Sequence, residues 1–122
     1  MIQRNAIKSW SLLPDVEVIL LGEETGLAEA AKELGVKHIP SVERNANGVP
    51  LISSMFQLAR ENSNSEFLCI INADMVLMPD FVEVAKQVKS QRSKFVLVSQ
   101  RWDYDITYTI DFAVGWESQL RE

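Results

Sequence analysis

Residues 67–74, with the sequence FLCIINAD, contain the most hydrophobic run of the chain and end in a carboxylate. Five apolar residues in succession predict a strand that is buried on both faces, as in the middle of a parallel sheet. Asn72 and Asp74 follow the run and are spaced by two, so they point to the same side if the strand continues through them. In open parallel sheets, ligands bind outside the carboxyl ends of the strands. The sequence therefore predicts that Asp74 lies at a ligand-binding edge.

Predicted strands and helices alternate on both sides of this run. Strands are predicted over residues 16–21, 36–39 and 95–98, and a half-exposed strand over residues 105–112. Helices are predicted over residues 3–13 and 27–34, and two more begin at Pro50 and at Pro79. Strands separated by helices indicate an α/β fold, a three-layer αβα arrangement around a mainly parallel sheet. The length of 122 residues fits one domain, residues 1–122.

Several apolar residues are assigned to the core by their spacing. Trp10 belongs to the apolar stripe of the first helix, and Ile52, Met55, Phe56 and Ala59 recur at the spacing of a core-facing helix. His38, the only histidine, lies within a short strand and is interpreted as a structural residue.

Composition excludes several classes of function. The chain has 12 basic and 17 acidic residues, a formal net charge of -5, which argues against nonspecific nucleic-acid binding. No apolar run approaches the roughly 20 residues of a transmembrane helix, and the first residues have no signal-peptide core. With Cys69 as the single cysteine, a disulfide within the chain is excluded and a cytoplasmic location is expected. A thiol in an apolar run keeps a high pKa, which disfavours Cys69 as a nucleophile.

Asn72 and Asp74 have two interpretations at this point. A carboxylate with an amide oxygen supplies hard-oxygen ligands for Mg²⁺ or Mn²⁺, especially where phosphate oxygens complete the coordination shell. An aspartate directly after a strand is equally typical of a simple turn. The spacing alone leaves both open.

Residues 70–81, IINADMVLMPDF, resemble the D-x-D segment of family 2 glycosyltransferases, which have the GT-A fold. Residues 47–60 resemble the glycine-bearing loop and following helix of that family. Residues 22–25, GEET, stand where the family has an acidic turn that contacts the nucleoside. The resemblance covers roughly residues 3–103, and Asn72 stands where the family has its first acidic residue.

This resemblance implies a GT-A-like, truncated domain that binds a nucleotide-sugar through Mn²⁺ or Mg²⁺ at Asp74, with Asn72 beside it. Glu23 would approach the base or ribose, and Arg44 would face phosphate, where a guanidinium fits two oxygens. The complete protein would transfer the sugar to an acceptor whose identity, like the catalytic base, the residues do not give. The first strand of the family fold and most of the acceptor-binding half have no counterpart in these residues.

Arg101 and Trp102 follow a predicted strand at the same edge of the sheet. Trp102 is a candidate for stacking on a sugar or base, and Arg101 is a candidate partner of Asp103 or of the substrate. Packing of Trp102 into the core is the competing interpretation.

Two functions from different classes remain. The segment around Asp74 favours a glycosyltransferase-like domain, whereas the short length favours a noncatalytic α/β module that keeps the fold for binding or assembly, so whether the chain is an enzyme stays open. The absence of a first strand would leave backbone groups of its neighbours unpaired, which is unfavourable. Two repairs are possible: the two neighbouring strands pair directly, or a second copy donates residues 105–112. The second repair leads us to expect a homodimer through this C-terminal strand.

Overall fold

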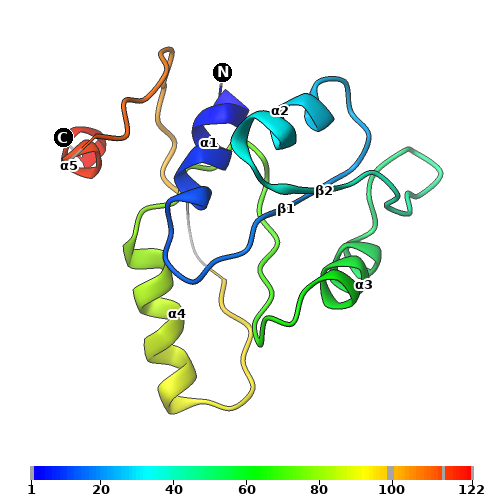
Figure 1. Ribbon diagram of the computed structural model, residues 1–122. Helices are drawn as coiled ribbons and strands as arrows, with labels where there is room; N and C mark the ends of the chain where they lie inside the picture. The colour runs from blue at the N-terminus through cyan, green and yellow to red at the C-terminus, as the bar shows by residue number, and fades with distance from the viewer. Residues whose placement is uncertain (1, 99–100, 114, 122) are drawn as a thin grey trace.

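The sheet of this protein is small, and helices surround it (Figure 1). The computed structural model describes residues 2–98, 101–113 and 115–121. Its elements in chain order are α1 (Ile2–Ser11), β1 (Ile19–Leu21), α2 (Leu27–Leu34), β2 (Lys37–Ile39), α3 (Ile52–Asn62), α4 (Asp80–Gln91) and α5 (Trp116–Arg121).

Strands β1 and β2 pair in parallel, and α2 connects them. Their register places Ile19 opposite Lys37 and Leu21 opposite Ile39. Helix α2 ends at Gly35, whose φ of 69° is in the left-handed region that glycine adopts readily, and the Gly35 N–H donates to the carbonyl of Ala31. The β–α–β unit predicted for residues 16–39 is therefore confirmed, although β1 is shorter than the predicted strand.

The core lies between α1, α2 and β1. Its buried residues are Ala6, Ile7, Trp10, Leu20 and Ala31. Partly buried side chains pack around them: Val18, Leu27, Leu34, Val36, Ile71 and Leu77. The prediction that Trp10 belongs to the core is confirmed, since 6% of the residue is exposed.

Helix α1 also holds the C-terminal part of the chain. Asn5 is buried, and its side-chain amide donates to the Tyr108 carbonyl at 2.9 Å while its oxygen accepts from the Ile110 N–H at 2.9 Å. An asparagine amide offers the same donor and acceptor as a peptide group. The Asn5 side chain therefore bonds the backbone of residues 108–110 as a neighbouring strand would. These residues are thus held by a helix of their own chain.

The predicted three-layer αβα fold with a mainly parallel sheet is wrong. The described residues form five helices and two short parallel strands, so the chain is more helical than sheet. Residues 67–71, 95–98 and 105–112, each predicted to be a strand, carry no strand within the described ranges. Consecutive apolar residues predict burial of side chains, but a strand also requires a neighbour that pairs with its backbone.

The buried face of α3 also differs from the prediction. The helix is present, yet Ile52 and Phe56 are exposed, and the buried residue is Ser54. The Ser54 hydroxyl accepts a hydrogen bond from the Glu43 N–H at 3.0 Å. Helix α3 is thus attached to the preceding loop by a polar contact, which the apolar periodicity does not indicate.

Helices α4 and α5 lie outside the central core. Val82 is the buried residue of α4, and Lys86 on the same helix forms an ion pair with Asp15, 3.3 Å between Nζ and Oδ2. Helix α5, which has no counterpart among the predicted elements, begins at Trp116, whose ring meets Phe112 edge-on at 4.9 Å between centroids. A membrane-crossing helix, long and apolar enough for a bilayer, is not found among the described residues.

We expect Asn5→Ala to lower the free energy of unfolding by about 2 kcal/mol, because two backbone groups near a buried position lose their partners. Urea denaturation followed by circular dichroism measures the change. Gln3→Ala on the exposed face of α1 is the matched control and should change little. Equal unfolding free energies of Asn5→Ala and the wild type would contradict the proposed role of Asn5 in holding residues 108–110.

Candidate functional site

The carboxyl ends of β1 and β2 carry a cluster of polar groups around Gly22. Arg44 Nη2 donates to Glu24 Oε1 at 2.7 Å, and Arg44 Nη1 donates to the Gly48 carbonyl at 2.9 Å. His38 Nε2 lies 2.7 Å from the Gly22 carbonyl, and because a carbonyl only accepts, this nitrogen carries the proton. The interpretation of His38 as a structural residue agrees with this bond.

Glycine is required at position 22 by space and by conformation. Its φ is 121°, and a Cβ there would collide with the Glu24 carboxylate and lie 3.2 Å from Arg44 Nη2. The missing side chain thus leaves room for the Glu24–Arg44 ion pair to lie directly against the end of β1.

The loop that carries Arg44 is held by its own hydrogen bonds. Asn45 Oδ1 accepts from the N–H groups of Asn47 and Val49 at 2.9 and 3.0 Å. The backbone N–H of Asn45 donates to the Val49 carbonyl, and Gly48 closes the turn with a φ of 78°. The position of Arg44 is therefore set by a self-contained turn.

The electrostatics of this cluster follow from the ion pair. The hydrogen bond from Arg44, followed by a backbone hydrogen bond, lowers the pKa of Glu24 from its ordinary value. The Arg44 side chain is 28% exposed, so the guanidinium is only partly hydrated. The guanidinium has five N–H donors, and the contacts with Glu24 and Gly48 use only some of them. The cluster thus contains a partly buried cation, Arg44, whose charge is balanced by the exposed carboxylate of Glu24.

Asp74 lies in a separate turn that α1 holds in place. The Met75 N–H donates to the Asn72 carbonyl at 3.2 Å and closes the turn. Trp10 Nε1 donates to the Met75 carbonyl at 2.8 Å, and the Ser9 hydroxyl accepts from the Leu77 N–H at 2.9 Å. Asn72 and Asp74 themselves are exposed. Asp74 is exposed as predicted, but the prediction that it follows a strand at the edge of the sheet is wrong, because residues 67–71 form no strand. The turn interpretation of the segment agrees with its position.

The predicted site residues are brought together only in part. Glu23 is exposed next to the Glu24–Arg44 pair, because it adjoins Glu24 in the chain. Among the described side chains, no hydrogen bond or ion pair joins Asp74 to Glu23 or to Arg44. The structure thus has two polar features that different contacts hold in place, the cluster at Gly22 and the turn at Asp74.

Arg101 and Trp102 lie in a third region. Arg101 Nε is 3.1 Å from Asp103 Oδ1, the ion pair that the sequence suggested. Trp102 is 95% exposed, so it does not pack into the core. Its indole is available for stacking, with no described ring against it.

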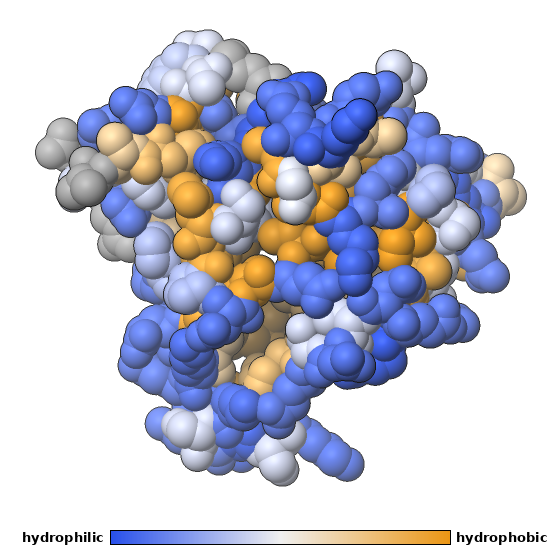
Figure 2. Space-filling model, in the orientation of Figure 1, coloured by the Kyte–Doolittle hydropathy of each residue, from blue (hydrophilic) through white to orange (hydrophobic). Residues whose placement is uncertain are grey.

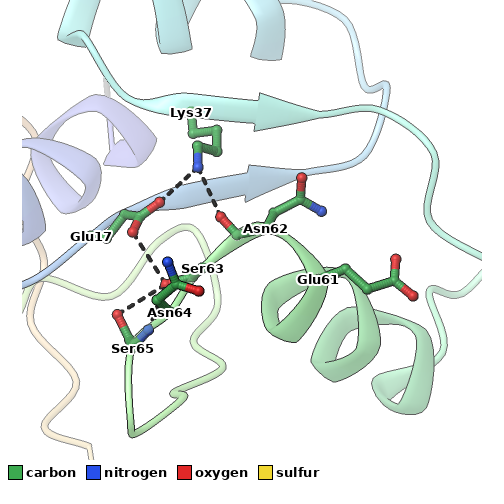
Figure 3. Close-up of a pocket in the computed structure, with 7 residues that line it drawn as sticks. All are labelled: Glu17, Lys37, Glu61, Asn62, Ser63, Asn64 and Ser65. Atoms are coloured by element: carbon green, nitrogen blue, oxygen red, sulfur yellow. Dashed lines mark hydrogen bonds and ion pairs between the residues drawn. The ribbon is translucent and has the colours of Figure 1, made fainter.

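A polar hollow at the opposite ends of the strands was not anticipated from the sequence. It has a volume of about 530 Å³ and is lined by Glu17, Lys37, Glu61, Asn62, Ser63, Asn64 and Ser65 (Figure 3). Lys37 Nζ donates to Glu17 Oε1 and to the Asn62 carbonyl, each at 2.8 Å. The contact of Ser63 with Glu17 joins positions that are far apart in the sequence, so it depends on tertiary structure.

The groups of this hollow satisfy one another. Ser63 Oγ donates to Glu17 Oε2 at 3.1 Å, and the hydrogen bonds from Lys37 and then from Ser63 lower the pKa of Glu17. The network connects the end of α3 to both strands (Figure 3). Lys37 and Glu17 both have partners within this network, so it joins the elements that it connects.

Cys69 is exposed in the structure, whereas its place in an apolar run predicts burial. Partial desolvation nevertheless raises the pKa of its thiol, which leaves less thiolate at neutral pH. The inference that Cys69 is a poor nucleophile agrees with this shift.

Comparison with known proteins gave no match. No protein-family model matches the chain, and neither does any curated protein or solved structure.

We expect the ion pair at Gly22 to contribute stability that is lost in acid. Because the pKa of Glu24 is lowered by folding, this contribution is complete above the ordinary value of 4.5 and fades as the pH falls through the lower folded value. Glu24→Gln should remove this part of the pH dependence and cost less than about 1 kcal/mol at neutral pH, since the carboxylate of the pair is exposed.

Thermal denaturation at a series of pH values measures the effect. Glu29→Gln, which removes an exposed carboxylate on α2 outside the described ion pairs, is the matched control. Identical pH profiles for Glu24→Gln and the wild type would show that the pair contributes nothing.

Proposed function

We propose that this chain binds a nucleoside diphosphate as the nucleotide part of a nucleotide-sugar, in a protein that transfers sugars. The observation that carries the proposal is the Asp74 carboxylate, exposed on a turn that two hydrogen bonds from α1 fix in position. A turn whose backbone is held in this way needs little rearrangement of the chain when its side chain binds a cation. The resemblance of residues 70–81 to a D-x-D segment supports the same assignment.

The residues fit a divalent cation that is shared with the ligand. Within the described ranges, no group of three or more His, Cys, Asp or Glu side chains could hold a metal ion by itself. Mg²⁺ is usually held by one or two carboxylates together with substrate phosphates. Asp74, with Asn72 of the same turn, would hold Mn²⁺ or Mg²⁺ in this shared manner. Such a cation would neutralise the charge of the diphosphate.

Arg44 and Glu23 are the proposed contacts from the second polar feature. The Arg44 guanidinium is partly buried and positioned by the turn at Gly48, and its present partner is an exposed carboxylate. An exposed ion pair is weak, so a phosphate with two oxygens can displace Glu24 at small cost. Glu23 adjoins this pair and would approach the ribose or base.

The chemistry of transfer is not assigned to any residue. The described residues form no arrangement that identifies a general base beside Asp74. We therefore expect the isolated chain to bind a nucleotide without detectable sugar transfer, with Arg101 and Trp102 as candidate contacts of the sugar side.

The second candidate function is a noncatalytic binding or assembly module. The observation that favours it is the large apolar surface left open, which includes Val96, Val98 and Trp102. Large apolar side chains that are exposed together mark interaction sites in proteins. Nucleotide binding and assembly are compatible, so each requires its own experiment.

We expect titration calorimetry with uridine or guanosine diphosphate to give heat that depends on Mn²⁺. Asp74→Asn should weaken the affinity about tenfold or more, because one contact to a charged group contributes about 1.5–3 kcal/mol. Asparagine suits a turn, so the fold should be retained.

The matched control is Glu83→Gln, which removes one negative charge from an exposed position of α4. Arg44→Gln in the same assay tests the second feature. If Asp74→Asn and Glu83→Gln bind as the wild type does, Asp74 has no place in the site.

A further inference from the structure

Two apolar segments lie side by side, and most of their side chains are exposed. Residues 67–71 follow α3 and residues 95–98 follow α4, and the rings of Phe67 and Phe95 are 5.1 Å apart between centroids. Figure 1 shows the two segments running in the same direction between α3 and α4. Val96 is 91% exposed and Val98 is 85% exposed. In Figure 2 apolar side chains gather in the hollowed middle of one face, between hydrophilic ones.

The backbone of residues 95–98 is also without a ladder partner. No backbone hydrogen bond of this segment occurs among the described residues, and the segment contains no proline and no charged residue. Leu97 is 45% exposed, about half as much as either valine beside it, which is the alternation of a strand with one open face. Uncovered, uncharged edges of this kind pair readily with another chain.

The solvent-exposed area of the whole chain also supports an interface with another chain. A compact monomer of 13.8 kDa exposes about 6,600 Å² according to the scaling of area with mass. This chain exposes 9091 Å², roughly 2,500 Å² more than that scaling gives. A stable homodimer needs about 1,000 Å² from each copy. The surplus therefore exceeds what one such interface buries.

We propose that residues 95–98 form the centre of a two-fold interface between two copies of this chain, with residues 67–70 contributing apolar surface beside it. The segments pair antiparallel with Leu97 on the axis, so that Val96 of each copy lies opposite Val98 of the other. Residues directly opposite in an antiparallel pair share a face, which brings four valines together. This inference concerns assembly and does not depend on nucleotide binding.

A second copy is the occupant that these observations favour. Pairing about a two-fold axis gives backbone hydrogen-bond partners to residues 95–98 of both copies through one interface. The assembly then closes at two chains. Residues 105–112, the strand expected to be exchanged, are held by Asn5 of their own chain. Residues 95–98 are instead the segment without backbone hydrogen bonds among the described residues. The homodimer predicted from the sequence is therefore proposed with a different interface.

Sedimentation velocity across the micromolar range tests the proposal. The wild type should sediment as a dimer, at twice the chain mass of 13.8 kDa. The double variant Val96→Lys, Val98→Lys should be monomeric with an unchanged circular dichroism spectrum, because both side chains are exposed in the single chain. The control Val49→Lys, Ile52→Lys changes two other exposed apolar positions and should remain dimeric.

A cross-link locates the axis. With Cys69→Ser removing the natural thiol, Leu97→Cys should form a disulfide between copies under mild oxidation, because opposite Cα atoms in antiparallel pairs lie at about 4.5–5.5 Å. Val49→Cys in the same background should not cross-link.

Three outcomes would overturn the proposal. A monomeric wild type would do so and would point to a different protein as the occupant of this face. A dimer that survives the lysine pair would place the interface elsewhere. Open oligomers without a dimeric end state would exclude a closed two-fold contact.

Discussion

Helix α1 is the element on which the rest of the structure depends, because it contacts parts of the chain that are remote in sequence. Ile7 and Trp10 close the core against β1 and α2. Trp10 and Ser9 also hold the backbone after Asp74, and Asn5 holds the backbone at residues 108–110. Each polar contact is made at a buried or half-buried position, where an unpaired group would be costly. Core packing and the placement of the Asp74 turn are therefore properties of the same helix.

The second constraint is that backbone groups require partners, which apolar side chains cannot replace. Residues 67–71 are hydrophobic enough for a central strand, and Ile71 does pack against the core. The segment nevertheless lacks a ladder in the described structure, and Phe67 and Ile70 remain exposed. A single chain in which residues 67–71 pair with no strand keeps an exposed apolar face. The same feature that makes the fold differ from the predicted one therefore supports the proposed dimer.

The hollow lined by Glu17 and Lys37 and the cluster around Gly22 lie at opposite ends of β1 and β2. They differ in how many partners their charged groups have. At the amino ends, Lys37 and Glu17 belong to a network that joins α3 to the sheet. At the carboxyl ends, Arg44 is balanced by the exposed carboxylate of Glu24. An exposed partner is exchanged more easily than a network of several bonds. The carboxyl ends are thus the better place for an anionic ligand, in agreement with the general rule for parallel strands.

The sequence by itself determined part of the local structure of this protein. Apolar spacing predicts the positions of α1 to α4, and the run at 16–21 predicts a strand that pairs in parallel with residues 37–39. It also gave Asp74 as an exposed carboxylate after an apolar segment. These features depend on neighbours within a few residues, which periodicity and capping describe well.

Only the tertiary structure decided how many strands pair and which side chains meet. The apolar runs at 67–71 and 95–98 signal burial, whereas pairing depends on whether another backbone lies alongside. The contacts of Asn5 with residues 108–110 span more than one hundred positions, so local patterns carry no trace of them. For the same reason the order of the segments does not show that different contacts hold Asp74 and the Glu24–Arg44 pair, because sequence order fixes connectivity and packing fixes contacts.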